Sequence, residues 1–266
     1  MRKSTASINR CDWIRIISAT FLLILFCRNE IRASSYEIPF APGEKLTFQL
    51  SWSFIPAGEA VLEVMPTKTI DGIQAYHFVL TAKSNPFVDV FYKVRDRIDA
   101  YVDLNMTRSL LYKKEQHEGN TKRDVMVNFN WDNHTAQYFN FSKMEKTIAI
   151  MPRAFDPLSV FFYSRLLDLK VDEMITSPVT DGKKCIIGKA KIVKKEKISL
   201  ANGTHDAYLL EPELEHIGGV FEKSEDAKIQ LWVSADRRRI PLKIKSKVVV
   251  GSFVGELIFA EGVRTP

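Results

Sequence analysis

The chain has 266 residues, of which 45% are hydrophobic and 26% are charged, and its formal net charge is +6. This balance is ordinary for a globular protein and excludes an intrinsically disordered chain. Residues 1–33 hold six of the basic residues and two of the acidic ones, so the remainder carries a charge of only about +2. Because no RNA- or DNA-binding motif accompanies this small excess, we expect no nucleic-acid partner.

The N-terminus has the pattern of a secretory signal peptide. Four basic residues precede an apolar run at residues 16–26, and small residues around Ala33 suit a cleavage site. The apolar run has about eleven residues, whereas a membrane-spanning helix needs about 20. We therefore predict export, cleavage near Ala33 and no transmembrane span in the mature chain. A retained anchor and a lipid-modified Cys27 are the alternatives.

Catalytic and metal-binding signatures are missing from the sequence. Only Cys185 lies beyond the signal-like segment, so no disulfide can form within the mature chain and its core has to stabilise it. None of the five histidines is paired at the spacing of metal ligands, and no nucleophile elbow or phosphate loop occurs. We predict a protein that is not an enzyme and has no cofactor, no metal and no catalytic residues.

The first predicted elements are β-strands. Hydrophobic and polar residues alternate through residues 44–54, which is typical of a half-buried strand. Pro56-Ala57-Gly58 suggests a turn, so we predict a hairpin over residues 44–66. Asp71-Gly72 predicts the turn into the next hairpin.

The stretch FYKVRDRIDAYVD, residues 91–103, carries a cluster of charges on a predicted strand. Alternation places Asp96 on the apolar face, and it makes Arg97 and Asp99 neighbours on the polar face. A buried acid needs a partner, so we expect an arginine from another strand, for which Arg239 is the candidate. A structural ion pair is the favoured interpretation, and a catalytic cluster is the alternative.

The same alternation continues along most of the chain, at residues 124–132, 134–142, 228–236, 241–250 and 255–263. A sheet of about a dozen antiparallel strands is expected to curl, because open twisted sheets rarely exceed about ten strands. We predict a mostly β fold in which a large antiparallel sheet forms a barrel or half-barrel as one domain over residues 34–266.

Residues 156–169 break this pattern. Asp156 suits a helix N-cap, Pro157 suits the first helical position, and apolar residues follow at helical spacing. Because this predicted helix is apolar on most sides, we expect it to be buried within the curve of the sheet.

Several stretches resemble one family in sequence and in order. They are PFAPGEKLTFQLSWSFIPAGEAVLEV, FYKVRDRIDAYVD, DPLSVFFYSRLLDL, VTDGKK and LWVSADRRRIPLKIKSKVVVGSFVGEL. Together they resemble a family of bacterial exported proteins known as domain of unknown function 3108. The resemblance implies a Gram-negative envelope location and an all-β domain similar to the half-barrel of periplasmic lipoprotein carriers. It implies no catalytic residues, and similarity of fold does not by itself imply function.

Two charged stretches each have two interpretations. The lysine-rich residues 183–197 suit an edge strand whose lysines prevent aggregation, or a surface for anionic lipid headgroups. Glu211, Glu213 and Glu215 alternate beside His216. They suit an exposed loop that could cover a cavity, or the carboxylates of a hydrolase.

Large aromatic residues are more numerous than a closed small barrel needs. Core packing accounts for them, but so does a cavity for an acyl chain with arginines at its mouth to pair with a carboxylate or phosphate. The candidate ligand-binding residues are Trp52, Phe54, Phe91, Arg95, Asp96, Arg97, Phe162, Trp232 and Arg239.

The favoured function is an exported periplasmic or envelope protein that binds a lipid or another amphipathic envelope component. The first alternative is a structural protein of the envelope with a protein or polysaccharide partner. The second is a carboxylate-dependent hydrolase.

Overall fold

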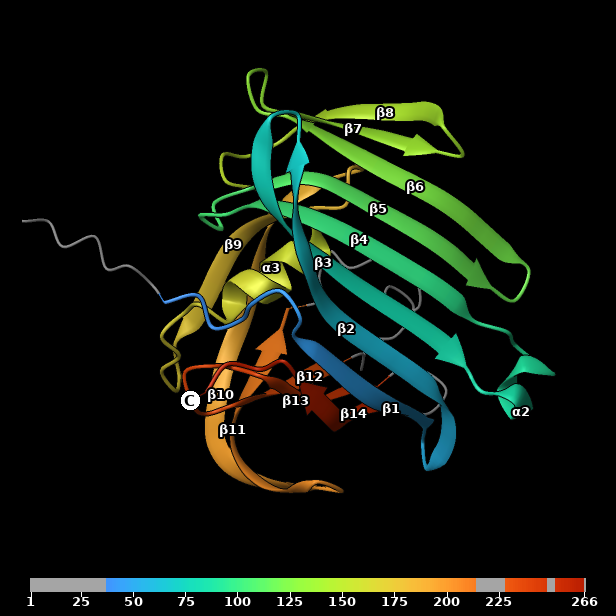
Figure 1. Ribbon diagram of the computed structural model, residues 1–266, viewed down its shortest axis with the longest axis vertical. Coiled ribbons are helices and arrows are strands. Elements are labelled where there is room, and N and C mark those ends of the chain that lie inside the picture. Colours follow the sequence, from blue (N-terminus) through green and yellow to red (C-terminus); the bar gives the residue numbers. More distant parts are fainter. Residues whose placement is uncertain (1–36, 214–227, 248–251, 266) are drawn as a thin grey trace, which may run out of the picture. The chain divides into compact units, whose positions relative to one another are not determined.

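The computed structural model describes residues 37–213, 228–247 and 252–265, and all elements below belong to the unit Ile38–Pro266. The predicted signal peptide, Cys27 and the cleavage position lie outside the described residues. Fourteen described strands form one antiparallel sheet in the order β8-β7-β6-β5-β4-β3-β2-β1-β14-β13-β12-β11-β10-β9. Figure 1 shows this sheet strongly curved, with α3 (Pro157–Ser164) on its concave side. The predicted mostly β fold with a curled antiparallel sheet is confirmed.

The strands are β1 (Lys45–Trp52), β2 (Ile55–Ile70), β3 (Ile73–Ser84), β4 (Arg95–Asp103), β5 (Ser109–Glu118), β6 (Thr121–Asn130), β7 (Thr135–Asn140), β8 (Lys143–Ala149), β9 (Met174–Thr180), β10 (Cys185–Leu200), β11 (Gly203–Pro212), β12 (Lys228–Ser234), β13 (Pro241–Lys247) and β14 (Ser252–Glu261). Besides α3, the described residues form the short helix α2 (Pro86–Asp89), which alternation did not predict.

The first hairpin turns earlier than its sequence suggests. The turn lies at Ser53 and Phe54, with Ser53 in the left-handed region at φ 56°. Pro56 and Gly58 belong to β2 instead. A Cβ atom at Gly58 would lie 2.1 Å from the carbonyl oxygen of Lys83 on β3. The glycine is therefore explained by close approach of two backbones, which only a residue without a side chain permits.

The sheet does not close through a β8–β9 ladder. Instead, the segment after β8 lies along β9: Phe155 N–H donates to Pro178 O at 2.9 Å, and Thr180 N–H donates to Phe155 O at 2.8 Å. In the same segment Met151 N–H donates to the sulfur of Cys185 at 3.4 Å. The two halves of the sheet are thus joined by a connecting segment at the seam between β8 and β9.

Helix α3 begins as predicted and ends early. The Asp156 side chain accepts hydrogen bonds from the N–H groups of Leu158 at 2.9 Å and Ser159 at 2.8 Å, so it is the N-cap. The helix ends at Ser164 rather than at residue 169, and Arg165 is its C-cap. The Phe162 ring stacks on Phe78 of β3 with 3.7 Å between ring centroids, which places the helix against the core.

The Arg165 side chain turns inward and forms a buried ion pair. Its guanidinium donates to the Glu44 carboxylate at 2.5 and 3.1 Å, and its Nε donates to Arg238 O at 3.1 Å. The side chain of Arg165 is 0% exposed and that of Glu44 is 2% exposed. The rings of Phe40 and Phe162 lie 5.3 and 5.5 Å from the guanidinium carbon. This pair ties the end of α3 to the residue before β1.

Candidate functional site

An apolar groove of about 500 Å³ lies between α3 and the β9–β12 part of the sheet. We call it the α3 groove. Side chains from α3 and the residues after it form one wall, and side chains from four strands form the other. Its main apolar lining residues are Val160, Phe161, Leu167, Ile175, Leu210 and Leu231. Volume and lining are both in the range of sites for small apolar ligands.

Small residues on β10 leave room for this groove. Gly188 and Ala190 both line it, and a Cβ atom at Gly188 would lie 3.1 Å from the Val179 side chain. Ala190 is paired with Ile175 of β9 and Pro212 of β11. A larger side chain at Ala190 would therefore project into space that the neighbouring strands leave open.

Charged side chains also line the α3 groove. Asp181, Lys184, Lys189 and Glu213 contribute to it, and the Lys189 ammonium lies 3.2 Å from the Glu213 carboxylate. An apolar groove with ammonium and carboxylate groups at its border suits a molecule with an apolar chain and a polar head.

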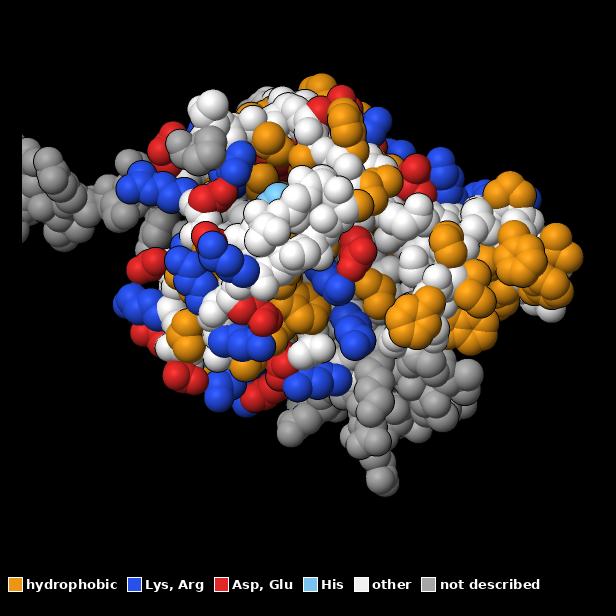
Figure 2. Space-filling view, turned by 90° about the horizontal axis from the view of Figure 1, so that it is seen from below, with side chains coloured by type: hydrophobic (Ala, Val, Ile, Leu, Met, Phe, Trp, Pro, Cys, Tyr) orange, Lys and Arg blue, Asp and Glu red, His pale blue; other side chains and the backbone are white. Residues whose placement is uncertain are grey.

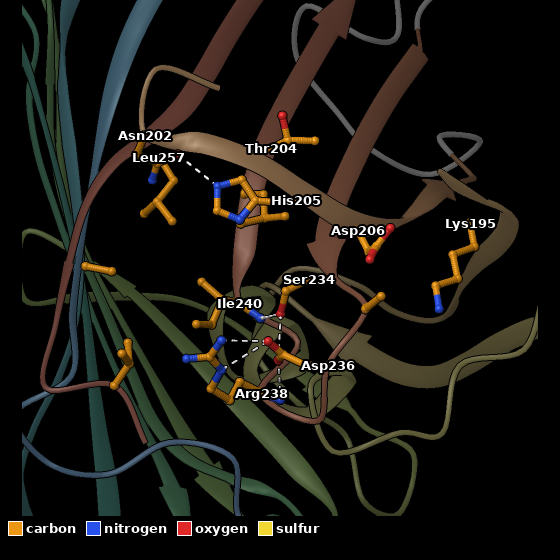
Figure 3. Close-up of a pocket in the computed structure, with 14 residues that line it drawn as sticks. Lys195, Asn202, Thr204, His205, Asp206, Ser234, Asp236, Arg238, Ile240 and Leu257 are labelled. Atoms are coloured by element: carbon orange, nitrogen blue, oxygen red, sulfur yellow. Dashed lines mark hydrogen bonds and ion pairs between the residues drawn. The ribbon is translucent and has the colours of Figure 1, made fainter. Parts of the chain in front are cut away.

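A second pocket, of about 550 Å³, lies where the end of the β10–β11 hairpin meets the β12–β13 turn. Figure 3 shows polar side chains around it, among them His205 from β11 and Asp236 and Arg238 from the turn. Arg238 donates to the Asp236 carboxylate at 2.6 and 3.2 Å. Burial alone would raise the pKa of Asp236, but the hydrogen bonds from Arg238 and Ser234 lower it.

Ser234 in this pocket has a structural environment. Its hydroxyl donates to Asp236 at 3.0 Å and accepts from Ile240 N–H at 2.9 Å, while His205 contacts Asn202 at 2.9 Å. A serine nucleophile needs a base on its hydroxyl, and here the partner is the carboxylate that also holds Arg238. The polar groups of this pocket therefore stabilise the β12–β13 turn.

The predicted aromatic candidates do not converge in one cavity. Trp52, Phe54 and Phe91 are exposed at the end of the sheet where β1 meets β2 and α2 lies, and Phe54 is 97% exposed. Phe162 belongs to α3, and its side chain is buried in the core against Phe78. Trp232 is half-buried on β12 and donates from Nε1 to Glu196 at 2.9 Å.

The arginine candidates are held by nearby acids or carbonyls. Arg95 donates to Asp89 of α2 at 2.6 and 3.0 Å, and Arg97 donates to Asp99 at 2.7 and 2.9 Å. Burial alone would raise the pKa of Asp99, but hydrogen bonds from Arg97 and His77 lower it. The expected pairing of Arg97 with Asp99 on one face is confirmed.

The expected pairing of Asp96 with Arg239 is wrong. Arg239 donates to the backbone carbonyls of Ala235 and Asp236 at the β12–β13 turn. Asp96 instead accepts a hydrogen bond from His117 N–H at 2.8 Å and shares one with the Glu118 carboxyl group. Burial, together with the Glu118 carboxyl group, raises the pKa of Asp96 to about 6, although the His117 hydrogen bond acts in the opposite direction.

The structure describes all of the lysine-rich stretch and part of the acidic stretch. The lysine-rich strand β10 is paired with β9 over Cys185–Lys191 and with β11 over Ala190–Leu200, so it is not the terminal strand of the sheet and the expectation of an edge strand is wrong for the strand as a whole. From Lys194 to Leu200, its only ladder among the described strands is the one with β11. Glu211 forms an ion pair with Lys228 at 2.9 Å, and Glu213 with Lys189. Glu215 and His216 lie outside the described residues.

The described residues contain neither a metal-ion cluster nor a membrane-spanning helix. Within residues 37–213, 228–247 and 252–265, no group of three or more His, Cys, Asp or Glu side chains is arranged to hold a metal ion. Over the same ranges, no helix is both long enough and apolar enough to cross a bilayer.

The groove residues were not among the sequence-based candidates. Ile175, Leu210 and Leu231 come from three strands that are brought together only by pairing, and no local pattern marks them. The available signal was the pair of small residues Gly188 and Ala190 between lysines, since small inward positions on a strand indicate space or close backbone approach.

Comparisons with known proteins give a family for this chain and one solved structure of similar fold. Residues 47–258 match the family model DUF3108, described as "Protein of unknown function". A β-barrel-like protein of the domain of unknown function DUF1849 from Brucella abortus has a TM-score of 0.52 at 7% identity, covering 85% of this chain and 100% of that one. A hypothetical protein from Chlamydia trachomatis has a TM-score of 0.36 at 9% identity, covering 86% and 92%. No curated protein matches the chain.

Proposed function

The chain belongs to the DUF3108 family of proteins of unknown function, and we propose that it is an exported, non-enzymatic protein that binds an amphipathic, lipid-like ligand. The α3 groove is the proposed binding site. The ligand's apolar chain would lie against α3 and the strands opposite, and its polar head would lie at the border of the groove, where Lys184, Lys189 and Glu213 are found.

The observation that carries this proposal is the composition of the groove. Its lining is mostly apolar, and it has the volume of a small-ligand site. On the other side of α3, by contrast, Phe162 and its neighbours fill the space as part of the core. Apolar surface that stays accessible in this way is stabilised when an apolar ligand covers it.

The state of the charged residues supports a non-enzymatic role. Arg95, Arg97, Asp99 and Asp236 each have a partner that holds them in a structural ion pair. The N-terminal pattern of basic residues followed by a short apolar run supports export to the periplasm or envelope.

Ala190→Phe tests the groove. The new ring would occupy the space that Ala190 leaves beside Ile175, so we expect at least a ten-fold weaker affinity for a fluorescent fatty acid. Titration of the fluorescent probe gives this ratio, and unlabelled oleate should displace it from the wild-type protein. Mass spectrometry of natively purified wild-type protein should show co-purified lipid.

The matched control is Ala201→Phe, the same change at an exposed position in the β10–β11 turn. Its affinity should equal that of the wild-type protein, and circular dichroism should show all three proteins folded. Equal affinity of the wild-type protein and Ala190→Phe, or no binding by either, would contradict the proposal.

A further inference from the structure

One end of the sheet displays a group of large apolar side chains that the fold does not bury. They come from the β1–β2 turn, from α2 and the residues after it, and from the start of β14. We call them the apolar tip: Trp52, Phe54, Ile55, Phe87, Val90, Phe91, Tyr92 and Phe253. Figure 2 shows hydrophobic side chains gathered at the right of the molecule, on the side where α2 lies in Figure 1.

The backbone of the apolar tip is held by specific polar contacts. Asn85 caps α2 by accepting from Val88 N–H at 2.9 Å, and it also donates to Pro56 O at 2.7 Å on β2. Asp89 accepts from Arg95 and from the Ser84 hydroxyl. The β1–β2 turn is attached to β14 by Ser53 N–H, which donates to Ser252 O at 2.7 Å. These contacts join three separate segments into one surface.

The exposed side chains contribute little to folding. Helix α2 buries none of its residues, and Phe91 is 77% exposed although its ring contacts that of Phe87 with 5.8 Å between centroids. Phe54 occupies the tip of a two-residue turn, where glycine, asparagine or aspartate are usual. An exposed apolar group of this kind, held in place by polar contacts, indicates a surface that another body covers.

The charges around the apolar tip favour an anionic partner. Lys83 is paired with Glu59, and Arg95 is paired with Asp89. Lys93 follows the tip residues directly and is exposed. Lys245 is exposed and is paired across the strands with Val254, so its side chain lies on the opposite face of the sheet from Phe253. The acids Asp96 and Glu118 lie near Tyr92 and are hydrogen-bonded to each other. The tip is therefore apolar at its centre, with Lys93 and Lys245 at its edge on the two faces of the sheet.

The composition of the tip favours a bilayer over a second folded surface. Trp52 and Tyr92 have rings with a polar atom, and such side chains concentrate at the interface between lipid headgroups and acyl chains. Phenylalanines on a turn and on a short helix can enter the acyl region without unpairing any backbone group of the sheet. Lysines at the edge would then meet anionic headgroups.

We infer that the apolar tip is a membrane-docking surface that inserts reversibly into the outer region of an anionic phospholipid bilayer. The inference goes beyond the α3 groove and stands whether or not the groove binds a ligand.

Vesicle flotation tests this inference with the double variant Phe54→Ser/Phe91→Ser. The wild-type protein should float with vesicles of phosphatidylethanolamine and phosphatidylglycerol, and the double variant should partition at least ten-fold less. Lys93→Glu/Lys245→Glu should weaken binding to these vesicles more than to phosphatidylcholine vesicles, because only the former carry net negative charge. All proteins carry the same N-terminus, so differences between them report the tip.

The matched control is Phe141→Ser/Phe259→Ser, which removes two phenylalanines that are exposed elsewhere on the sheet. This variant should float like the wild-type protein. Equal flotation of wild-type protein and the tip variant would overturn the inference, and so would absence of wild-type binding.

Sedimentation velocity without vesicles tests whether the apolar tip instead binds a second copy of the chain. A dimer that forms in the wild-type protein and is lost in the tip variant would overturn the inference and assign the surface to a second copy. Affinity for a fluorescent fatty acid should be unchanged in the tip variant, which separates this test from that of the groove.

Discussion

The guanidinium group of Arg165 is the most deeply buried charge that the sequence pattern did not predict. It occupies the core with Glu44 as its carboxylate partner and two aromatic rings beside it. Helical spacing alone marks Arg165 as one of the few polar positions on the predicted helix. Its inward direction follows from Glu44, more than a hundred positions away, and no local pattern encodes such a contact.

Removal of Glu44 should be strongly destabilising. Glu44→Leu leaves the Arg165 charge buried without a counter-charge, so we expect the free energy of unfolding to fall by about 3–5 kcal/mol. In the double variant Glu44→Leu/Arg165→Met no charge remains in the core, and we expect most of that loss to be recovered. Urea denaturation of the wild-type protein and of the two variants measures both effects. A double variant as unstable as the single one would show that the loss comes from packing.

Asp96 makes stability depend on pH. Its pKa of about 6 in the folded protein lies above the value of about 3.9 of an unfolded chain, so the folded state binds more protons between these values. Ionised Asp96 therefore destabilises the folded protein. This destabilisation is absent below about pH 4, grows as pH rises, and is complete above about pH 6. Asp96→Asn should remove this slope, because an amide oxygen can still accept from His117 N–H.

Exposure to solvent limits the contribution of Asp96 to the free energy of unfolding. Asp96 is only partly buried, so we expect Asp96→Asn to raise the free energy of unfolding at pH 7 by about 1 kcal/mol rather than by the full equivalent of the shift. Urea denaturation between pH 4 and pH 8 gives the profile for both proteins. Parallel profiles would mean that Asp96 does not titrate in this range. The inward face of Asp96 was predictable from alternation, but its carboxyl partner depends on how β4 and β5 are paired.

At the scale of elements, the start of α3 was predictable and its end was not. Asp156 and Pro157 form a local start signal that needs no tertiary information. The structure adds a distant contact, because the Ser109 hydroxyl at the start of β5 donates to the Asp156 carboxylate at 2.6 Å. The helix ends where Arg165 turns toward Glu44, and that cause lies outside the helix. Gly58 is a similar case. The glycine itself can be seen in the sequence, but the reason for it is the backbone of Lys83 on another strand, which no local pattern reveals.

The Asp156 carboxylate should be essential for this junction. Asp156→Ala removes the acceptor for two backbone N–H groups and for the hydroxyls of Ser109 and Ser159, all in a buried site. We expect about 3 kcal/mol of destabilisation, more than a solvent-exposed N-cap costs, because buried donors lose their only partner. Ser109→Ala should cost about 1–2 kcal/mol. Thermal unfolding followed by circular dichroism compares them, and equal effects would contradict this ranking.

At the scale of the whole molecule, alternation was sufficient to predict the class of fold. Period-two patterns recur from β1 to β14, and a sheet of that size has to curl. The seam between β8 and β9 was not predictable, because the contact of Phe155 with Val179 depends on how the ends of a long sheet meet. The α3 groove has the same origin, since its walls come from α3 and from strands that only the curled sheet brings opposite each other.

The ladder between β1 and β14 has a consequence for how the chain folds. Every other ladder between the described strands joins strands that are consecutive in sequence, whereas Lys45 is paired with Glu261. Local hairpins close at small entropic cost, whereas this central ladder closes a loop between the two ends of the sheet-forming chain, so we expect it to form after the runs of hairpins on either side. Until then, β1 and β14 each present an open edge to any other extended chain. The period before this last pairing is therefore when the newly made protein is most prone to aggregate.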